Sequence, residues 1–526
     1  MSIAHAMQIV GIRDKHLWDI KLVFLERDIS IDTSRTKRQF LTREDFANRV
    51  DLCYMDYKMN VAILGRQPAL GIAELESVFG ANSIKIISNQ AVTIKVDLFN
   101  IQKFGGIPKA GIIVDELSKS DWHKVSQKVV QYYFSKWSAY EGKITLGISV
   151  YGFAIDARDV QKTGIILKQK LKKCGVSLRL IPNHSPNLNS AVSHHNKLGL
   201  SANKVELLIV CTSDGKVLIA ESTGSQNITA YANRDQMRPK RDAFVGMLPP
   251  KLAQIMINLA VGDPSTSISS RRLHAGSTKG PGALLKSGSR CLEKTDMQVS
   301  SALRATDATS IHGTLEPKSD PTPGLESDLA RSSALNEDAS SGELERLRVL
   351  DPFCGTGVIL QEAVLMGCSV YGTDLSEKMV RYSRDNINWL ADSHHIKFDW
   401  FLRVGDAMTT KWQQPIDAVV SEAYLGQPFS APPSPAKLQD VVQNCNHIIS
   451  EFLKNLAGQI ESGVPICIAI PAWRSVDGNF THLPLISTIA RLGYRPHEFT
   501  NVSQNDLLYY RENQLVAREL LVLTKI

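Results

Sequence analysis

Short apolar runs alternate with amphipathic stretches through the last third of the chain. The runs predict strands at 346–350, 369–373, 398–404, 418–421 and 464–470. Residues 358–366 carry the apolar spacing of a helix, and strands that alternate with helices are typical of a doubly wound parallel sheet. Two further apolar runs, 506–510 and 516–523, are separated by polar residues and predict a β-hairpin.

The first half of the chain shows a different order of elements. Residues 60–118 predict strand, helix, strand and strand, with the helix at 69–79. Residues 122–229 predict helix, strand, helix, strand, helix, strand and strand, which makes a small α/β module with its own core. A strongly apolar helix is predicted at 251–260.

Two segments stand outside these patterns. Residues 1–58 are mixed in character and are treated as an N-terminal extension. No aromatic residue occurs between Asp263 and Gly342, where Ser, Thr, Gly, Pro and charged residues dominate. Such a stretch cannot bury enough apolar surface to offset its ordering entropy, so residues 263–342 predict a disordered insertion.

Composition narrows the class of protein. The chain has 526 residues, 43% hydrophobic and 21% charged, which is typical of globular proteins with several domains. Its net charge of +7 is compatible with a nucleic-acid partner. The eight cysteines are scattered without a C-x-x-C pair, which favours a reducing compartment and argues against a metal site. We find no run of about 20 apolar residues and no signal peptide, and we expect a cytoplasmic protein.

The segment 350–357, Leu-Asp-Pro-Phe-Cys-Gly-Thr-Gly, carries the most specific chemistry. It lies between a predicted strand and a predicted helix, where glycines allow a ligand to approach bare backbone N–H groups. The next predicted strand ends in Asp374, which is placed to accept the ribose hydroxyls of an adenosine-type cofactor. The segment lacks the G-x-G-x-x-G of nicotinamide-binding folds. It resembles the cofactor loop of S-adenosylmethionine-dependent methyltransferases that act on amino groups of nucleic-acid bases.

Four blocks of sequence, 231–242, 246–253, 351–357 and 509–520, resemble one family. It comprises the THUMP-domain tRNA guanine-N2 methyltransferases, which methylate guanosine at position ten of tRNA. The resemblance runs from about residue 60 to residue 526, without the insertion. It implies an α/β fold with a Rossmann-like methyltransferase domain behind a ferredoxin-like and THUMP α+β RNA-binding region. The implied parts are 59–120 (ferredoxin-like), 121–230 (THUMP-like), 231–262 (linker and first catalytic helix) and 343–526 (methyltransferase).

The resemblance also implies S-adenosyl-L-methionine as cofactor. The implied cofactor-binding residues are Asp351, Phe353, Gly355, Gly357, Asp374, Asp406 and Ala407. In this assignment the two glycines pass under the methionine end, with Asp351 near its amino group. Asp374 holds the ribose, and Asp406 contacts the adenine amine. For Asp406, the role of an ordinary turn residue or helix cap is an equal alternative.

The expected catalytic loop departs from the family pattern. Amino-group methyltransferases of this type carry Asp/Asn-Pro-Pro-Tyr after the fourth strand, whereas this chain has Ser421-Glu422-Ala423-Tyr424. Ser421 and the Glu422 carbonyl could accept the two N–H hydrogens of the target amine, or the Glu422 carboxylate could replace the missing acid. Tyr424 either stacks on the base or packs against the protein. The loss of both prolines also leaves open an inactive site.

Basic residues form two candidate RNA contacts, and their ordinary alternative is a solvated face. One group lies on the polar linker and the other on the helix near residue 170. These residues are Arg234, Arg238, Lys240 and Arg241 on the linker, with Lys172 and Lys173 on the helix. Together with the family resemblance, phosphate binding is favoured.

The leading hypothesis is therefore a tRNA methyltransferase that modifies the exocyclic N2 amine of guanosine. A small activating protein subunit is a further partner that the sequence neither requires nor excludes. One alternative is a catalytically silent RNA-binding protein that keeps the methyltransferase scaffold. Another is a DNA amino-methyltransferase, against which the THUMP-like region argues.

Overall fold

A computed structural model describes residues 59–97, 99–119, 121–242, 248–262, 346–427, 429, 431–475, 477–512 and 514–526. The predicted N-terminal extension, 1–58, and the predicted disordered insertion, 263–342, lie outside these residues. No helix within the described ranges has both the length and the apolar character needed to cross a membrane.

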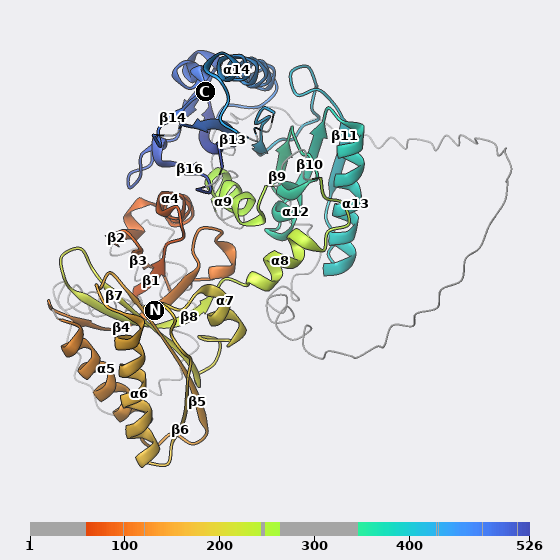
Figure 1. The fold of residues 1–526 in the computed structure, drawn as a ribbon. Helices are drawn as coiled ribbons and strands as arrows, with labels where there is room; N and C mark the ends of the chain where they lie inside the picture. The colour runs from red at the N-terminus through yellow and green to blue at the C-terminus, as the bar shows by residue number, and fades with distance from the viewer. Residues whose placement is uncertain are drawn as a thin grey trace, which may run out of the picture. The chain divides into compact units, whose positions relative to one another are not determined.

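The first part of the chain forms one mixed sheet of eight strands, in the order β2-β3-β1-β4-β8-β7-β5-β6 (Figure 1). Its strands are β1 (Met59–Ile63), β2 (Ile84–Ser88), β3 (Ala91–Lys95), β4 (Lys109–Leu117), β5 (Lys143–Tyr151), β6 (Ser177–Leu180), β7 (Lys204–Cys211) and β8 (Val217–Ser225). Its helices are α4 (Pro68–Phe79), α5 (Trp122–Trp137), α6 (Ala157–Lys173) and α7 (Ser190–His195). The amphipathic helices α5 and α6 pack against each other (Figure 1).

Strand β4 was not predicted from the sequence. It joins the two predicted modules into one sheet. It pairs with β1 on one side and with β8 on the other. Its apolar run is short and is bordered by charged residues, so it lacks the signature of a central strand. Lys109 is nevertheless buried, forming an ion pair with Glu206 and donating to the carbonyl oxygen of Leu188 at 2.6 Å. The domain boundaries in this region stay predictions.

The C-terminal part is the expected doubly wound α/β sheet, in the order β11-β10-β9-β12-β13-β17-β15. Its strands are β9 (Arg348–Asp351), β10 (Ser369–Asp374), β11 (Trp400–Val404), β12 (Ala418–Glu422), β13 (Pro465–Arg474), β14 (Phe480–Thr481), β15 (Tyr494–Pro496), β16 (Leu508–Tyr509) and β17 (Val516–Lys525). The first five are parallel to one another, whereas β17 runs antiparallel to β13 and pairs with β16. The predicted terminal hairpin is therefore confirmed.

Helices cover both faces of this sheet. The core on one face takes residues from α9 (Pro250–Val261), α12 (Val358–Leu365) and α13 (Glu377–His394). The core on the other face takes residues from α14 (Pro435–Ala457) and the 3₁₀ helix η4 (Pro484–Leu492). The predicted apolar helix at 251–260 is confirmed as α9, and it contacts both β12 and β13.

The predicted polar linker begins inside a helix, because residues 231–236 belong to α8 (Ile228–Gln236). The Asn227 side chain caps this helix by accepting from the backbone N–H of Ala230 at 2.9 Å. Tyr231 is its buried residue, and the helix has no apolar stripe. The hydrophobic pattern of the sequence therefore does not predict this helix. The Tyr231 hydroxyl is hydrogen-bonded to Gln254 of α9.

A buried carboxylate ties the first sheet to the methyltransferase-like part. Glu74 of α4 accepts the backbone N–H groups of Gly105 and Gly106, and also the Asn258 amide of α9, each at 2.8 Å. Burial raises the pKa of Glu74 to about 7. Two residues further along α4, Glu76 accepts the backbone N–H of Thr500 at 2.6 Å. Helix α4 is thus hydrogen-bonded to α9 and to the segment after β15 in the second part.

Candidate active site

The loop between β9 and α12 contains two glycines with positive φ, and they have different physical reasons. Gly355 has φ +52°, and a Cβ added there would meet no heavy atom closer than 4.0 Å. Gly357 has φ +79°, and an added Cβ would lie 2.8 Å from the Ser383 hydroxyl. Gly355 therefore leaves room above the loop, whereas Gly357 allows the loop to pack closely on α13.

The loop is held by side chains that the sequence reading did not identify. The carbonyl oxygens of residues 355, 356 and 357 accept from Ser383 at 2.8 Å, Asn386 at 2.8 Å and Gln361 at 2.9 Å. Asn386 also exchanges hydrogen bonds with the backbone of Lys240, both at 2.9 Å, so the residues after α8 are tied to the loop. In the sequence, these side chains differ from ordinary surface residues only in being polar positions on the buried faces of α12 and α13.

Asp351 is a buried carboxylate without a cationic partner among the described residues. Its Oδ1 accepts from the Ser421 hydroxyl at 2.6 Å and from the backbone N–H of Phe353 at 3.3 Å. No described residue donates to Oδ2. Burial raises the pKa of Asp351 to about 8. A ligand ammonium group would complete the hydrogen bonding of this side chain and favour its charged form.

Asp374 holds the same loop from the end of β10. Its two carboxylate oxygens accept from the backbone N–H groups of Gly355 and Ser376, each at 2.9 Å. Each oxygen has a second lone pair and can still accept from a hydroxyl group. Burial raises the pKa of Asp374. The next residue, Leu375, is 73% exposed and offers an apolar surface beside the carboxylate, a feature that the sequence reading overlooked.

The other expected cofactor residues turn toward the protein. Phe353 packs edge-to-face against Phe452 of α14, with the ring centroids 5.2 Å apart. Ala407 is buried in the core on the α14 face. Asp406 is half-buried and accepts the backbone N–H of Met408 at 2.9 Å, which is the turn-residue role that the sequence left open. The backbone around Asp406 remains at the carboxyl end of β11.

Ser421 and Glu422, at the end of β12, have different environments. Ser421 is fully buried and donates its proton to Asp351, so the structure does not present it to a substrate amine. Glu422 forms an ion pair with Arg518 of β17, and the two side chains are 17% and 8% exposed. Of the two readings of this loop, the geometry favours the Glu422 carboxylate. Arg518 had not been identified from the sequence.

Tyr424 is placed on the surface near the same strand end. It is 36% exposed, and partial burial raises the pKa of its hydroxyl. Gly426, two residues on, lies against α14, because an added Cβ would meet Val441 at 2.9 Å. The loop after β12 is therefore anchored by this close approach rather than by the two prolines of the family pattern.

The expectation of phosphate contacts is wrong for two of the linker arginines. Arg234 makes two hydrogen bonds to the buried carboxylate of Glu362, at 2.7 and 3.1 Å, and lies over the Tyr231 ring. The Arg238 side chain is 1% exposed, and its guanidinium lies 3.5 Å from Asp235. Arg234 therefore joins α8 to α12 of the catalytic part, and Arg238 is buried rather than exposed to solvent.

The remaining candidate RNA contacts lie on the surface. Lys240 is 40% exposed and lies 3.8 Å from Asp385. Arg241 is exposed immediately after it. Lys172 and Lys173 are exposed on the last turn of α6. The ammonium groups of Lys172, Lys173 and Lys240 lie at the surface, where a polyanion can contact them.

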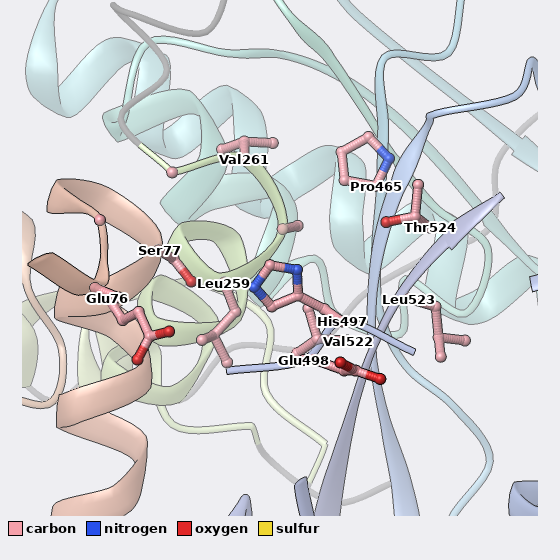
Figure 2. Close-up of a pocket in the computed structure, with 14 residues that line it drawn as sticks. Glu76, Ser77, Leu259, Val261, Pro465, His497, Glu498, Val522, Leu523 and Thr524 are labelled. Atoms are coloured by element: carbon pink, nitrogen blue, oxygen red, sulfur yellow. The ribbon is translucent and has the colours of Figure 1, made fainter. Parts of the chain in front are cut away.

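A cavity of about 380 Å³ lies away from this site. It is lined by residues of α4, α9, β13 and β17, among them Glu76, Leu259 and His497 (Figure 2). Pro465, the first residue of β13, and Thr524 of β17 are cross-strand partners in its wall. The cavity is therefore at the amino end of β13, whereas Glu422 and the glycine loop lie at the carboxyl ends of their strands.

Comparison with known proteins assigns the C-terminal part. Residues 344–464 match the family model of a methyltransferase domain. This part of the chain is a methyltransferase domain. Its expected glycine loop, Asp351–Gly357, and the end of β12 both lie within the match.

Two curated relatives and one solved structure extend the comparison. Over 130 residues, 25% of this chain, it is 31% identical to a tRNA (guanine(10)-N2)-dimethyltransferase of Methanothermobacter thermautotrophicus. Over 83 residues, 16% of this chain, it is 40% identical to the Pyrococcus abyssi protein of the same name. The matches span 34% and 21% of those relatives. The crystal structure of TrmN from Thermus thermophilus aligns with 89% of this chain and 99% of its own, at 14% identity and a TM-score of 0.42.

Proposed function

We propose that the chain is an S-adenosylmethionine-dependent methyltransferase that modifies the exocyclic N2 amine of a guanosine in tRNA, with position ten as the expected target. The observation that carries the proposal is a carboxylate, Glu422, held at the end of β12 beside the glycine loop. The methyltransferase domain supports the reaction class. The names of the two curated relatives support the substrate.

The loop residues fit the cofactor. The carboxylate of Asp351 lacks a cationic partner among the described residues, which suits the α-ammonium group of S-adenosylmethionine. The open space above Gly355 suits a ligand that lies on the backbone, and Asp374 can accept from ribose hydroxyls. When bound, this cofactor supplies an electrophilic methyl group. Leu375 gives its purine ring an exposed apolar neighbour.

Glu422 performs the part of the missing acid. Its carboxylate can accept an N–H hydrogen of the target amine, which orients the nitrogen lone pair and lowers the cost of developing positive charge on nitrogen. Arg518 restrains that carboxylate through the ion pair. Tyr424 offers a partly exposed ring on which a base can stack. Ser421 acts on the cofactor side by donating to Asp351.

The tRNA backbone would contact the surface lysines. Lys172 and Lys173 on α6 and Lys240 after α8 lie on two different parts of the described structure, which suits a long polyanion. The hydrogen bonds between Asn386 and the Lys240 backbone tie the second contact to the glycine loop. Phosphate binding there would therefore be coupled mechanically to the cofactor site.

If a small activating subunit is used, the edge strand β11 is the place we assign to it. Within the described residues β11 pairs only with β10. Three of its apolar side chains are exposed: Trp400 at 37%, Phe401 at 43% and Val404 at 50%. An exposed edge with apolar side chains can pair with a strand of a partner.

The proposal is tested with the full-length protein, labelled S-adenosylmethionine, and either bulk tRNA or duplex DNA. Mass spectrometry of the digested nucleosides should find the label in N2-methylguanosine or N2-dimethylguanosine from tRNA, and none in DNA. Label in DNA bases would instead support the DNA amino-methyltransferase. Binding of both cofactor and tRNA without any labelled nucleoside would support the silent scaffold. As a control, the variant Lys454→Met, changed on the exposed surface of α14, should give the same labelled nucleosides as the wild type.

A further inference from the structure

The ion pair at the end of β12 leaves unused hydrogen-bonding capacity. Arg518 Nε donates to Oε1 of Glu422. Within the described residues, Oε2 of Glu422 and the terminal amino groups of Arg518 have no hydrogen-bond partner. Both side chains are nevertheless largely buried, at 17% and 8% exposure. These unpaired atoms reach solvent, so an acceptor and a set of donors lie side by side where a polar ligand can contact them.

The pair lies where the target base has to be. Glu422 is the last residue of β12 and directly follows Ser421, whose hydroxyl donates to Asp351 of the glycine loop at 2.6 Å. Arg518 of β17 is paired with Pro471, near the carboxyl end of β13, and with Tyr509 of β16. The partly exposed ring of Tyr424 follows Glu422 by two residues. In open α/β sheets, ligands bind outside the carboxyl ends of the strands.

The Watson–Crick edge of guanine is complementary to this pair. It presents, in order, the acceptor O6, the donor N1–H and the donor N2–H₂. A carboxylate accepts the last two, and a guanidinium beside it donates to the first. We propose that Glu422 and Arg518 together read this edge, which makes Arg518 a specificity-determining residue through its contact with O6. This inference rests on the proposed function and adds the means of base selection.

Other purines do not match the same array. Adenine has an acceptor at N1, facing the carboxylate, and an amino group in place of O6, facing the guanidinium. The base 2-aminopurine keeps the reactive N2 amine but has an acceptor at N1 and no group at position six. In 2,6-diaminopurine an N–H donor faces Arg518. These analogues therefore separate the reaction at N2 from the reading of the neighbouring atoms.

The experiment uses full-length protein and tRNA transcripts that carry guanosine, 2-aminopurine or 2,6-diaminopurine at the methylated position. For the wild type, we expect kcat/KM for guanosine to exceed that for 2-aminopurine about 100-fold, since two hydrogen bonds to charged groups are lost. In Arg518→Met the ratio should fall to about 10-fold, because only the N1–H contact with Glu422 remains. The control Lys454→Met, which removes an exposed ion pair on α14, should keep the wild-type ratio.

The ratio, rather than the absolute rate, decides the outcome. An equal ratio in the wild type and Arg518→Met would overturn the assignment of Arg518 and leave the proposed function standing. Absence of guanosine methylation by the wild type would remove both. Cofactor binding, measured by calorimetry, shows whether Arg518→Met is folded. If it is not, Arg518→Lys takes its place, because one ammonium cannot fully serve both Glu422 and O6. Its ratio should lie between 10-fold and 100-fold by the same reasoning, and a wild-type ratio would again overturn the proposal.

Discussion

Restoring the family acid at position 421 provides a sharp test of the site. The sequence resemblance alone implies that Ser421→Asp should improve catalysis, because amino-group methyltransferases of this type carry Asp or Asn there. The structure implies a loss. Ser421 is fully buried, and its hydroxyl lies 2.6 Å from Oδ1 of Asp351, so an aspartate at this position would bring two buried carboxylates into contact.

The size of the loss follows from Asp351 itself. Burial raises the pKa of that residue from 3.8 to about 8, so at pH 7 the folded protein retains a proton that the unfolded chain has released. At about 1.4 kcal/mol per pKa unit, this costs the fold about 4 kcal/mol at pH 7. A second carboxylate in the same pocket should cost at least as much again, since desolvation and like-charge repulsion both disfavour its ionised form.

The sign of the pH dependence is also fixed. Between the unfolded pKa and the folded pKa, the native state binds more protons than the unfolded state, so the free energy of unfolding falls as pH rises. For Ser421→Asp this fall between pH 4 and pH 8 should be about twice as steep as in the wild type. Denaturant unfolding at a series of pH values measures it, and methylation of tRNA measures activity.

Ser421→Asn is the matched control, because its amide is neutral and can still donate to Asp351. It should lose about 1 kcal/mol or less of stability relative to the wild type. A Ser421→Asp protein that is as stable as the wild type at pH 7 and methylates tRNA faster would refute the placement of Ser421 beside Asp351. It would instead place residue 421 against the substrate.

The other predictions concern the cofactor, the loop supports and the RNA contacts. Affinity for S-adenosylmethionine should rise up to about tenfold per pH unit between pH 5.5 and 7.5, because binding needs ionised Asp351; calorimetry with Asp351→Asn should show a flat profile. Asn386→Ala leaves the Thr356 carbonyl unpaired, and should lower the unfolding free energy by about 1–3 kcal/mol and weaken cofactor binding; unchanged affinity would contradict the role of this support. When Lys172 and Lys173 are removed together, the slope of the logarithm of the tRNA binding constant against the logarithm of salt concentration should fall by the equivalent of about two phosphate contacts. Arg234→Ala should leave that slope unchanged while costing about 3–5 kcal/mol of stability, as measured by filter binding and denaturant unfolding.

The sequence predicted those parts of the fold in which a local pattern reports the environment. The glycine loop, the apolar helix α9 and the terminal hairpin each have a periodic or turn signature. Strand β4 does not, because its buried lysine, Lys109, has the appearance of a surface residue until Glu206 is known to face it. Long-range ion pairs leave no trace in one sequence.

The candidate site shows the same division. The positions of Asp351, Asp374 and Glu422 follow from strand ends, which the hydrophobic pattern locates. Their partners do not follow, because Ser421 and Arg518 reach them through pairing between strands that are distant in the chain. For the same reason, Arg234 was predicted to contact phosphate, whereas in the structure it forms an ion pair with Glu362.

The most direct test of the account is methyl transfer by Glu422→Ala, compared with the wild type under single-turnover conditions. Cofactor and tRNA affinities are measured in parallel. The account predicts that N2-methylguanosine formation falls at least about 100-fold while both affinities stay within about threefold, because the lost carboxylate acts on the amine during reaction. Formation of N2-methylguanosine at the wild-type rate by Glu422→Ala would contradict the central claim that this carboxylate replaces the family acid.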